Sequence, residues 1–418
     1  MAGRKGEDLG GVGGGGLARF LLPLLFLSAA RLPGQEPAAV PSPEESRQGW
    51  FDVEELLAGA GRLRGRLAEA GLKGELVYIG DHFWNLRGGA DTSDTGEYRG
   101  DVSLLLEFDP AALGLWRGGT FFAHLQEQHG HTVVRHVGDY QGISNIDADD
   151  FKQVSEFWYE HTFLGGRLRL KAGRQEMNED FAFTEYGLEF VNSSAGLPPS
   201  VPIATFPDPG WGAMAAAGPW PWLTLAGGVF EGRPDGGRSL VNTLDEQYGP
   251  FLIGQGTLSY ELVGRPGQLR AGGWFNGDRA DRLGGGQVPE TWGFYLVADQ
   301  LLWREQPLAE EEQGIGLFLQ YAWAPRDRSE VPDYLGGGIQ WVGAIPGRDR
   351  DILGVGAFHA RFSSRADFAE PYETAIEFFY RFQLTRAISL KPDLQYLVNP
   401  GGTYRDALAG GVRLEVVF

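Results

Sequence analysis

The last ten residues of the chain, "AGGVRLEVVF" at positions 409–418, pose the question that decides the fold. Successive side chains of an extended strand point to opposite faces. The apolar residues, among them Leu414 and the terminal Phe418, therefore share one face, and Arg413 and Glu415 share the other. In a soluble sandwich the apolar face would meet a protein core. In a membrane barrel it would meet lipid, and the charged face would meet a water-filled lumen.

Composition favours a single all-β domain. The chain has 418 residues and no sharp change of composition after residue 75, which predicts one large domain. It contains 64 Gly, 12 Trp, 14 Tyr and 26 Phe, and long segments of helical period are scarce, so we expect many short strands joined by turns. Cysteine is absent, which excludes disulfides and thiolate metal sites.

Charge and hydropathy exclude two classes of protein. The net charge of −19 would repel phosphate, so we predict no nucleic-acid partner. The mean hydropathy of −0.23 and the lack of any apolar run of about 18 residues exclude a helical membrane bundle. They do not exclude a barrel, whose strands are apolar on one face only.

The N-terminal segment has the order of a signal peptide. In "LARFLLPLLFLSAA" at 17–30, an apolar run at 20–27 follows basic residues and precedes small ones. We therefore assign residues 1–34 to a signal peptide for export and expect the mature chain to start between residues 29 and 36.

Residues 35–74 are predicted to form a linker and one short periplasmic helix. The stretch 33–49 is rich in Pro and Glu, as linkers are. Asp52 and Glu55 then resemble a capping box, and a helical spacing of apolar residues follows until Gly71.

Residues 75–418 contain sixteen strand-like segments of roughly 8–12 residues, near the ~9–11 residues that a tilted strand needs to cross a bilayer. The predicted starts are Glu75, Asp101, Gly119, Ser155, Arg167, Gly210, Leu223, Leu252, Gln268, Trp292, Ile315, Tyr334, Ile352, Glu373, Ile388 and Leu408.

The predicted connections alternate in length. The long ones are 87–100, 129–154, 176–209, 231–250 and 277–291, and the short ones include 164–167, 219–222, 263–267 and 385–387. Short turns on one rim and long loops on the other are typical of an outer-membrane barrel whose two ends are periplasmic. A soluble sandwich gives no reason for this asymmetry.

The faces of the strands agree with a barrel. In 376–384, 168–171 and 388–396, bulky apolar residues alternate with residues that are mostly charged or polar, as expected for one face in lipid and one in water. Aromatic residues near segment ends are candidates for interfacial girdles: Trp84, Trp158, Trp220, Trp222, Trp303 and Tyr396.

The chain resembles the carbohydrate-selective porins of Gram-negative outer membranes, the OprB type. The resemblance covers nearly all of 72–418 and is carried, in order, by "WNLRGG" (84–89), "GDYQGISNIDA" (138–148), "GRLRLKAGRQEMNEDFA" (166–182), "FVNSSAGLPPSVP" (190–202), "APRDRSEVPDYLGGGIQWVGAIPGRDRDILGVGAF" (324–358), "ETAIEFFYRFQLTRAISLKPDLQYLVNPGG" (373–402) and Phe418. It implies a transmembrane antiparallel β-barrel of about 16 strands in the outer membrane that lets sugars diffuse through. It also implies that the assembly machinery reads Phe418.

The third long loop, 176–209, is the predicted constriction, because such a loop commonly folds into the barrel. Carboxylates and amides can bond sugar hydroxyls, and aromatic rings can stack on a pyranose. The candidate residues are Glu176, Asn178, Glu179, Asp180, Phe183, Glu185 and Tyr186.

Five basic residues are predicted to face the loop from the wall. Opposed charges across a lumen polarise water, which favours neutral polar solutes or, alternatively, selects ions. The candidates are Arg169, Lys171, Arg381, Lys391 and Arg413.

Five histidines lie close together in the sequence, with "HGH" at 129–131, but their spacing fits no compact metal site, so we predict no metal and no cofactor. They are His124, His129, His131, His136 and His161.

We therefore expect a porin, and not an enzyme, that passively passes carbohydrates and other small polar solutes. The expected partners are lipid and the barrel assembly machinery, with a homo-oligomer as a further option. No G-x-S-x-G, H-E-x-x-H or phosphate loop is present. The alternatives are a general or anion-selective porin and, less favoured, a barrel enzyme or a secreted all-β glycosidase.

Overall fold

The computed structural model describes residues 64–233, 249–305 and 313–418. The predicted signal peptide and linker lie outside these residues, as does the first part of the predicted helix. Residues 64–69 are helical, and the chain leaves the helix at Gly71, whose φ of 82° suits a residue without a side chain. Among the described residues there is no helix long and apolar enough to cross a membrane.

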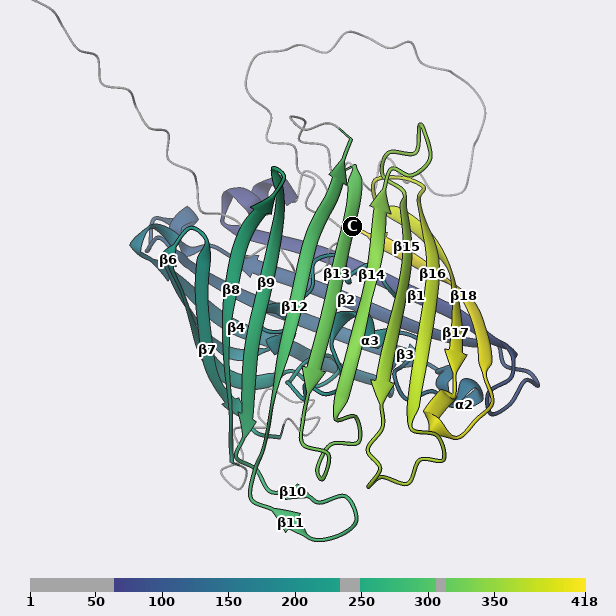
Figure 1. Ribbon diagram of the computed structural model, residues 1–418. Helices are drawn as coiled ribbons and strands as arrows, with labels where there is room; N and C mark the ends of the chain where they lie inside the picture. Colours follow the sequence, from purple (N-terminus) through teal and green to yellow (C-terminus); the bar gives the residue numbers. More distant parts are fainter. Residues whose placement is uncertain (1–63, 234–248, 306–312) are drawn as a thin grey trace, which may run out of the picture.

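Sixteen of the eighteen strands in the described residues form a closed antiparallel barrel (Figure 1). Each barrel strand pairs with its neighbours in the sequence, and β18 closes the ring on β1. The barrel strands are β1 (Leu72–Arg87), β2 (Glu97–Phe108), β3 (Gly119–Gly130), β4 (Phe151–Phe163), β5 (Leu168–Gln175), β6 (Gly210–Trp220), β7 (Leu223–Glu231), β8 (Pro250–Leu262), β9 (Arg265–Asn276), β12 (Thr291–Arg304), β13 (Gly314–Trp323), β14 (Asp333–Val342), β15 (Ile352–Arg361), β16 (Tyr372–Gln383), β17 (Ile388–Val398) and β18 (Ala407–Val417).

The sequence predicted every barrel strand. The largest errors in the predicted starts are at β2, which begins at Glu97 and not Asp101, and at β4, which begins at Phe151 and not Ser155. The sequence did not predict the two-residue strands β10 (Ala280–Asp281) and β11 (Gln287–Val288), which pair within the loop between β9 and β12.

The predicted asymmetry of the rims holds in part. The lower rim in Figure 1 carries the longer connections, including 131–150 and 176–209, and both ends of the barrel sequence lie at the upper rim. The upper rim does not consist of short turns alone, because the connections 109–118 and 343–351 also belong to it. Short helices occupy several connections: η1 (Pro110–Leu113), α2 (Val134–Val137), η2 (Leu164–Gly166), η3 (Met177–Glu179), α3 (Ser193–Gly196) and η4 (Pro400–Gly402).

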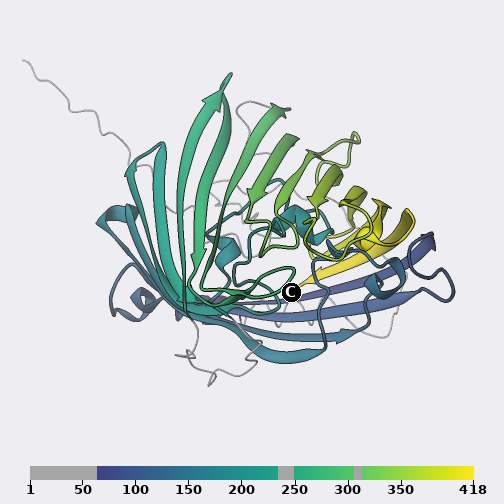
Figure 2. The same cartoon turned by 60° about the horizontal axis from the view of Figure 1, so that its bottom comes forward.

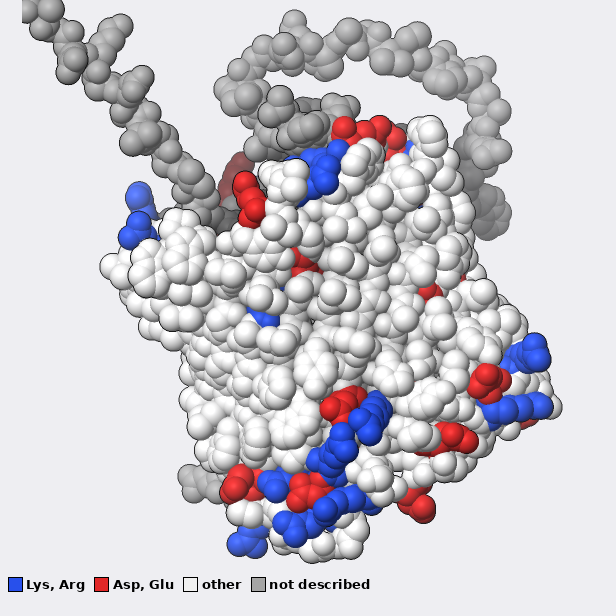
Figure 3. Space-filling view, in the orientation of Figure 1, with Lys and Arg blue, Asp and Glu red and all other residues white. Residues whose placement is uncertain are grey.

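The alternation of the strands separates an apolar outer face from a polar lumen face. On β16, Ile376 and Phe378 are 44% and 49% exposed on the outside, whereas Glu377 between them is fully buried inside. On β18, Leu414 lies outside while Arg413 points inward. On the face that Figure 3 shows, the middle of the outer surface is almost free of charge, and charged side chains gather toward the rims. The apolar face of "GVRLEVVF" is therefore on the outside of the barrel.

One of the predicted girdle residues lies inside the barrel. Trp158 is buried and stacks on Phe122 with ring centroids 4.8 Å apart, whereas the other five candidates are exposed. The cause is a β-bulge: His124 pairs with Glu156 and Leu125 with Val154, so one extra residue stands on β4. An extra residue exchanges the two faces of the strand beyond it.

Candidate functional site

The 176–209 loop lies inside the barrel. Viewed from the lower rim, its teal chain crosses the interior (Figure 2). Its apolar side chains are removed from solvent, with Met177, Phe181, Phe190 and Val191 each exposed by no more than 1%. Burial of this kind stabilises by roughly 1.5–3 kcal/mol per large side chain, so the inward position is held by packing along the loop.

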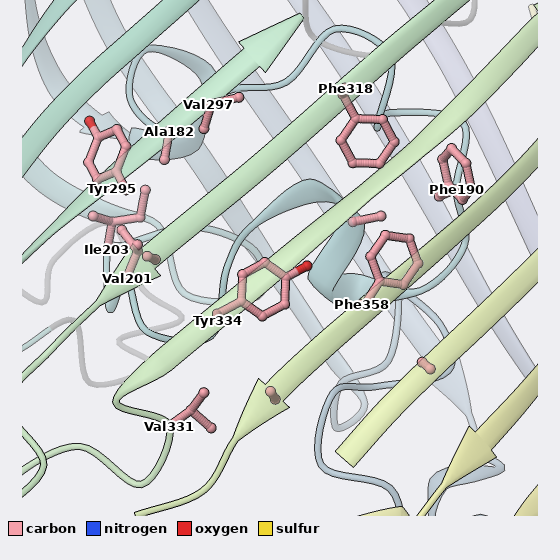
Figure 4. Close-up of a cluster of buried hydrophobic side chains, with 14 of the residues drawn as sticks. Ala182, Phe190, Val201, Ile203, Tyr295, Val297, Phe318, Val331, Tyr334 and Phe358 are labelled. Carbon is pink, nitrogen blue, oxygen red and sulfur yellow. The ribbon is translucent and has the colours of Figure 1, made fainter. Parts of the chain in front are cut away.

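Phe190 packs the loop against the barrel wall. Its ring meets Phe318, Phe358 and Phe379 edge to face, with centroids 5.0–5.7 Å apart, and the first two of these partners are seen beside it in Figure 4. The wall opposite the ring is formed by glycines. A Cβ added to Gly338 would lie 2.7 Å from the Phe190 ring, so the missing side chain creates the space that the ring fills.

Tyr186 and Ser194 fix two further points of the loop. The ring of Tyr186 lies over Gly316, where an added Cβ would come within 2.2 Å of it. The hydroxyl of Tyr334, which is buried on β14, donates a hydrogen bond of 2.5 Å to the Ser194 carbonyl in α3 (Figure 4 shows this tyrosine).

Carboxylates of the wall bind backbone amides of the loop. Asp299 on β12 accepts hydrogen bonds from the amides of Glu185 and Tyr186, at 3.0 and 3.1 Å, and from the Thr184 hydroxyl at 3.1 Å. Glu377 on β16 accepts from the amides of Val191 and Asn192 at 2.6 and 3.0 Å. Hydrogen bonds to charged groups contribute about 1.5–3 kcal/mol each.

Four of the predicted site residues meet at the base of the loop. Arg169 donates to Glu160 at 2.7 Å and to Asp180, and Lys171 donates to Glu179 and Asp180 at 3.1 and 3.2 Å. Burial would raise the pKa of Asp180, but Lys171 and Arg169 hold it below its usual range. Asp180 therefore stays ionised and joins the loop to β5.

The other three predicted cations lie on β16–β18, away from this cluster. Arg381 and Lys391 both meet Glu189 of the loop, at 2.5 and 3.0 Å. Arg413 forms two bonds of 2.8 Å to Asp81 on β1. Each of these cations is thus paired with a carboxylate.

The remaining loop candidates have different surroundings. Asn178 donates to the carbonyl of Phe181 within the loop, and the Phe183 ring lies 5.4 Å from the Arg270 guanidinium. Glu185 is exposed to the lumen. Glu176, at the start of the loop, accepts a hydrogen bond of 2.9 Å from Thr205, and burial together with the neighbouring Glu156 raises the pKa of Glu176 to about 7.

Porins have this arrangement, in which a loop folds into a closed sixteen-stranded barrel and charged groups surround it. Comparison with known families identifies the kind of porin. The sequence profile described as "Carbohydrate-selective porin, OprB family" matches residues 93–418. The chain belongs to this family.

Relatives of this OprB-family chain are porins by name. It is 22% identical to Porin B of Pseudomonas aeruginosa, over 87% of this chain and 91% of that protein. It is also 22% identical to the putative porin QuiX of Acinetobacter baylyi, over 96% of this chain and all of that protein. The high-pH structure of Pseudomonas putida OprB covers 86% of this chain and 97% of its own, with a TM-score of 0.77 and 20% identity, and so has the same fold.

Family and fold together indicate a carbohydrate channel of the outer membrane rather than an enzyme. The sequence did not single out Asp299, Glu377 or Glu189, which hold the loop. Their inward-facing positions were readable from the strand alternation for the first two, but nothing in the sequence marks the amides that they bind.

Proposed function

We propose that this OprB-family porin selects small neutral polyhydroxy solutes at the 176–209 loop. The observation that carries the proposal is that the wall carboxylates and cations hold the loop within the barrel. Partly exposed groups of the loop remain in contact with lumen water: Asn178, Glu179, Phe183, Glu185 and Tyr186. Amide and carboxylate oxygens accept from sugar hydroxyls, and aromatic faces suit the apolar face of a pyranose.

The pairing of the wall cations argues against an anion-selective porin. All five predicted cations meet carboxylates at salt-bridge distance. A paired cation presents little net field to a passing ion, whereas a dense set of fixed dipoles can still exchange hydrogen bonds with a neutral solute.

Liposome swelling tests this function. Proteoliposomes are expected to swell fastest in isosmotic monosaccharides, more slowly in disaccharides and slowest in trisaccharides, because the loop narrows the lumen. The reversal potential in a salt gradient should stay small. Rapid anion flux with swelling that does not depend on sugar size would instead identify a general or anion-selective pore.

The cell outer membrane is indicated by family and fold, and we propose that residues 1–34 act as the export signal, although they lie outside the described residues. We also propose that Phe418 is read during barrel assembly. Its amide donates to the Leu76 carbonyl at 2.9 Å, and its carbonyl accepts from the Leu76 amide at 3.3 Å. The last residue therefore takes part in the seam that removes the free edges of the sheet.

Deletion of Phe418 is expected to lower the amount of heat-modifiable barrel in the outer membrane while synthesis continues, because the seam loses two backbone hydrogen bonds and its terminal aromatic. Semi-native electrophoresis of membrane fractions measures the amount of heat-modifiable barrel. Phe378→Ala, at a similarly exposed position on the lipid face of β16, is the matched control. Equal assembly of both variants and the wild type would show that Phe418 carries no signal.

A further inference from the structure

Three ionisable side chains converge where the loop begins, and only Glu176 among them is also a constriction candidate. His124 on β3 and Glu156 on β4 are register partners across the β-bulge, and Glu176 is the first residue of the 176–209 loop. The bulge directs both Ser155 and Glu156 inward, since both are fully buried. Bulges of this kind often redirect a side chain toward a functional site.

One ligand atom from each of His124, Glu156 and Glu176 lies within 4.8 Å of the other two. The His124 Nδ1 atom is 3.7 Å from Glu156 Oε1, and the two side chains are 8% and 0% exposed. Neither of these two atoms has a hydrogen-bond partner in the structure. Two buried polar atoms thus lie close together without a hydrogen bond between them.

The surrounding hydrogen bonds determine what kind of group can link His124 Nδ1 and Glu156 Oε1. The Ser103 hydroxyl donates its proton to Asp101 at 2.8 Å, so it can only accept from His124 Nε2, which is 2.9 Å away. Nε2 therefore carries the hydrogen, and in neutral His124 the Nδ1 lone pair points at a carboxylate oxygen. Two acceptors in this position require a cation between them, either a second proton or a metal ion.

The other atoms of the cluster are already oriented. Glu156 Oε2 accepts from the Glu176 amide at 3.0 Å and from the Trp158 indole at 3.2 Å, and Glu176 Oε2 accepts from Thr205. Such bonds fix ligand orientation in metal sites. Among the residues that the structure describes, neither glutamate forms a salt bridge with lysine or arginine, because nearby Lys171 is bound to Glu179 and Asp180.

We propose that His124, Glu156 and Glu176 form a site for one divalent transition-metal ion, with Zn²⁺ as the best match. One imidazole nitrogen and two carboxylate oxygens suit zinc, whereas Ca²⁺ and Mg²⁺ prefer oxygen ligands alone. Two ligands about 2.1 Å from a tetrahedral zinc stand roughly 3.4 Å apart, close to the 3.7 Å between His124 Nδ1 and Glu156 Oε1. The Glu176 ligand atom lies within 4.8 Å of the other two and would have to move closer to complete the site.

A metal here would join the first residue of the loop to two wall strands. Glu176 is the one ligand that belongs to the loop, and it is partly exposed, so water can complete the coordination. Bound metal would thereby fix the base of the loop, beside the Arg169 and Lys171 cluster.

Calorimetric titration of the EDTA-treated, detergent-solubilised full chain with ZnCl₂ tests the site. The wild type is expected to bind one Zn²⁺ per chain. His124→Ala and Glu176→Gln should each weaken binding by at least about tenfold, since even substitutions behind a ligand cost about 10–100-fold in affinity. With Co²⁺ as a spectroscopic probe, the wild type should show visible d–d bands that Glu176→Gln loses.

The matched controls are Glu127→Gln and His129→Gln. These two residues form another histidine–carboxylate pair on β3, 3.1 Å apart, with no third ligand among the residues that the structure describes. Their replacement should leave the Zn²⁺ affinity unchanged. Heat-modifiable migration confirms that each variant is a folded barrel. If His124→Ala does not assemble, Glu176→Gln decides the question, because it changes only the loop. Wild-type affinity in Glu176→Gln, or no saturable binding to the wild type, would overturn the proposal.

Discussion

Replacing Asp299 with alanine is expected to raise the single-channel conductance, increase the current fluctuations and weaken the discrimination between mono- and oligosaccharides. The Asp299 carboxylate accepts hydrogen bonds from two backbone amides and one hydroxyl in the middle of the 176–209 loop. Asp299 also accepts a hydrogen bond of 2.5 Å from the Arg270 guanidinium. The variant therefore loses the bonds to the loop and leaves a buried guanidinium without its carboxylate.

The size of the effect follows from these losses. Hydrogen bonds to a charged group contribute about 1.5–3 kcal/mol each, so two of them change the ratio of bound to released loop by roughly a hundredfold or more. Removing one partner of a buried ion pair costs a further ~3–5 kcal/mol. The strand ladders are untouched, because Asp299 contributes its side chain only. We therefore expect the loop to be released while the barrel remains closed.

Planar-bilayer recordings and liposome swelling measure this change. Asp299→Asn keeps an acceptor for the loop amides but loses the charge facing Arg270, so its conductance should lie between those of the wild type and the alanine variant. Asp333→Ala is the matched control, since Asp333 has arginine partners too, but they are exposed at the rim. If the Asp299→Ala channel conducts and discriminates like the wild type, the loop does not limit passage.

The orientation of the wall residues could be predicted from the sequence because it depends on a local rule. Period-two alternation placed Arg169, Lys171, Arg381, Lys391 and Arg413 on the inner face, and all five are there. A position near a segment end predicted an interfacial Trp158, and this was wrong because the bulge on β4 turns its side chain inward. The sequence marks the bulge only by two adjacent polar residues, Ser155 and Glu156, which interrupt the alternation.

The partners of these residues could not be predicted, because the path of the loop depends on contacts distant in the sequence. Glu189 lies 192 residues before Arg381 and 202 before Lys391, to whose side chain it also offers its carbonyl. Phe190 occupies a space created by glycines of β14 and β15. Glycine in a strand can mark a bulge, a bend or a close approach, so the sequence alone does not identify the ring that fills the space.

Contacts distant in the sequence also explain why the sequence could not identify His124 as a metal-ligand candidate. Of the five clustered histidines, only His124 belongs to a group of three metal-ligand side chains within the described residues. The "HGH" pair at 129–131 gave the stronger local pattern, yet among the described residues His129 has only Glu127 as a carboxylate at salt-bridge distance. The other two ligands come from β4 and from the loop, which no spacing rule connects to β3.

Replacing Arg169 and Lys171 together with alanine is expected to shift the ion preference of the channel toward cations. The two cations now balance Glu160, Glu179 and Asp180 at the base of the loop. Their loss leaves these carboxylates without partners, and the negative potential extends into the lumen. The shift should be largest in dilute salt, because the Debye length is about 30 Å at 0.01 M and about 3 Å at 1 M.

Reversal potentials across a salt gradient measure this shift, and two variants separate charge from geometry. Arg169→Lys with Lys171→Arg keeps both charges and should retain the wild-type reversal potential. Arg167→Ala removes an exposed charge at the turn before β5 and should change little. The lost charge affects neutral sugars only through weaker attachment of the loop where it joins β5. The rate of liposome swelling should therefore change less than in Asp299→Ala, which removes the bonds that hold the middle of the loop. An unchanged reversal potential in dilute salt would mean that permeating ions do not pass this part of the wall.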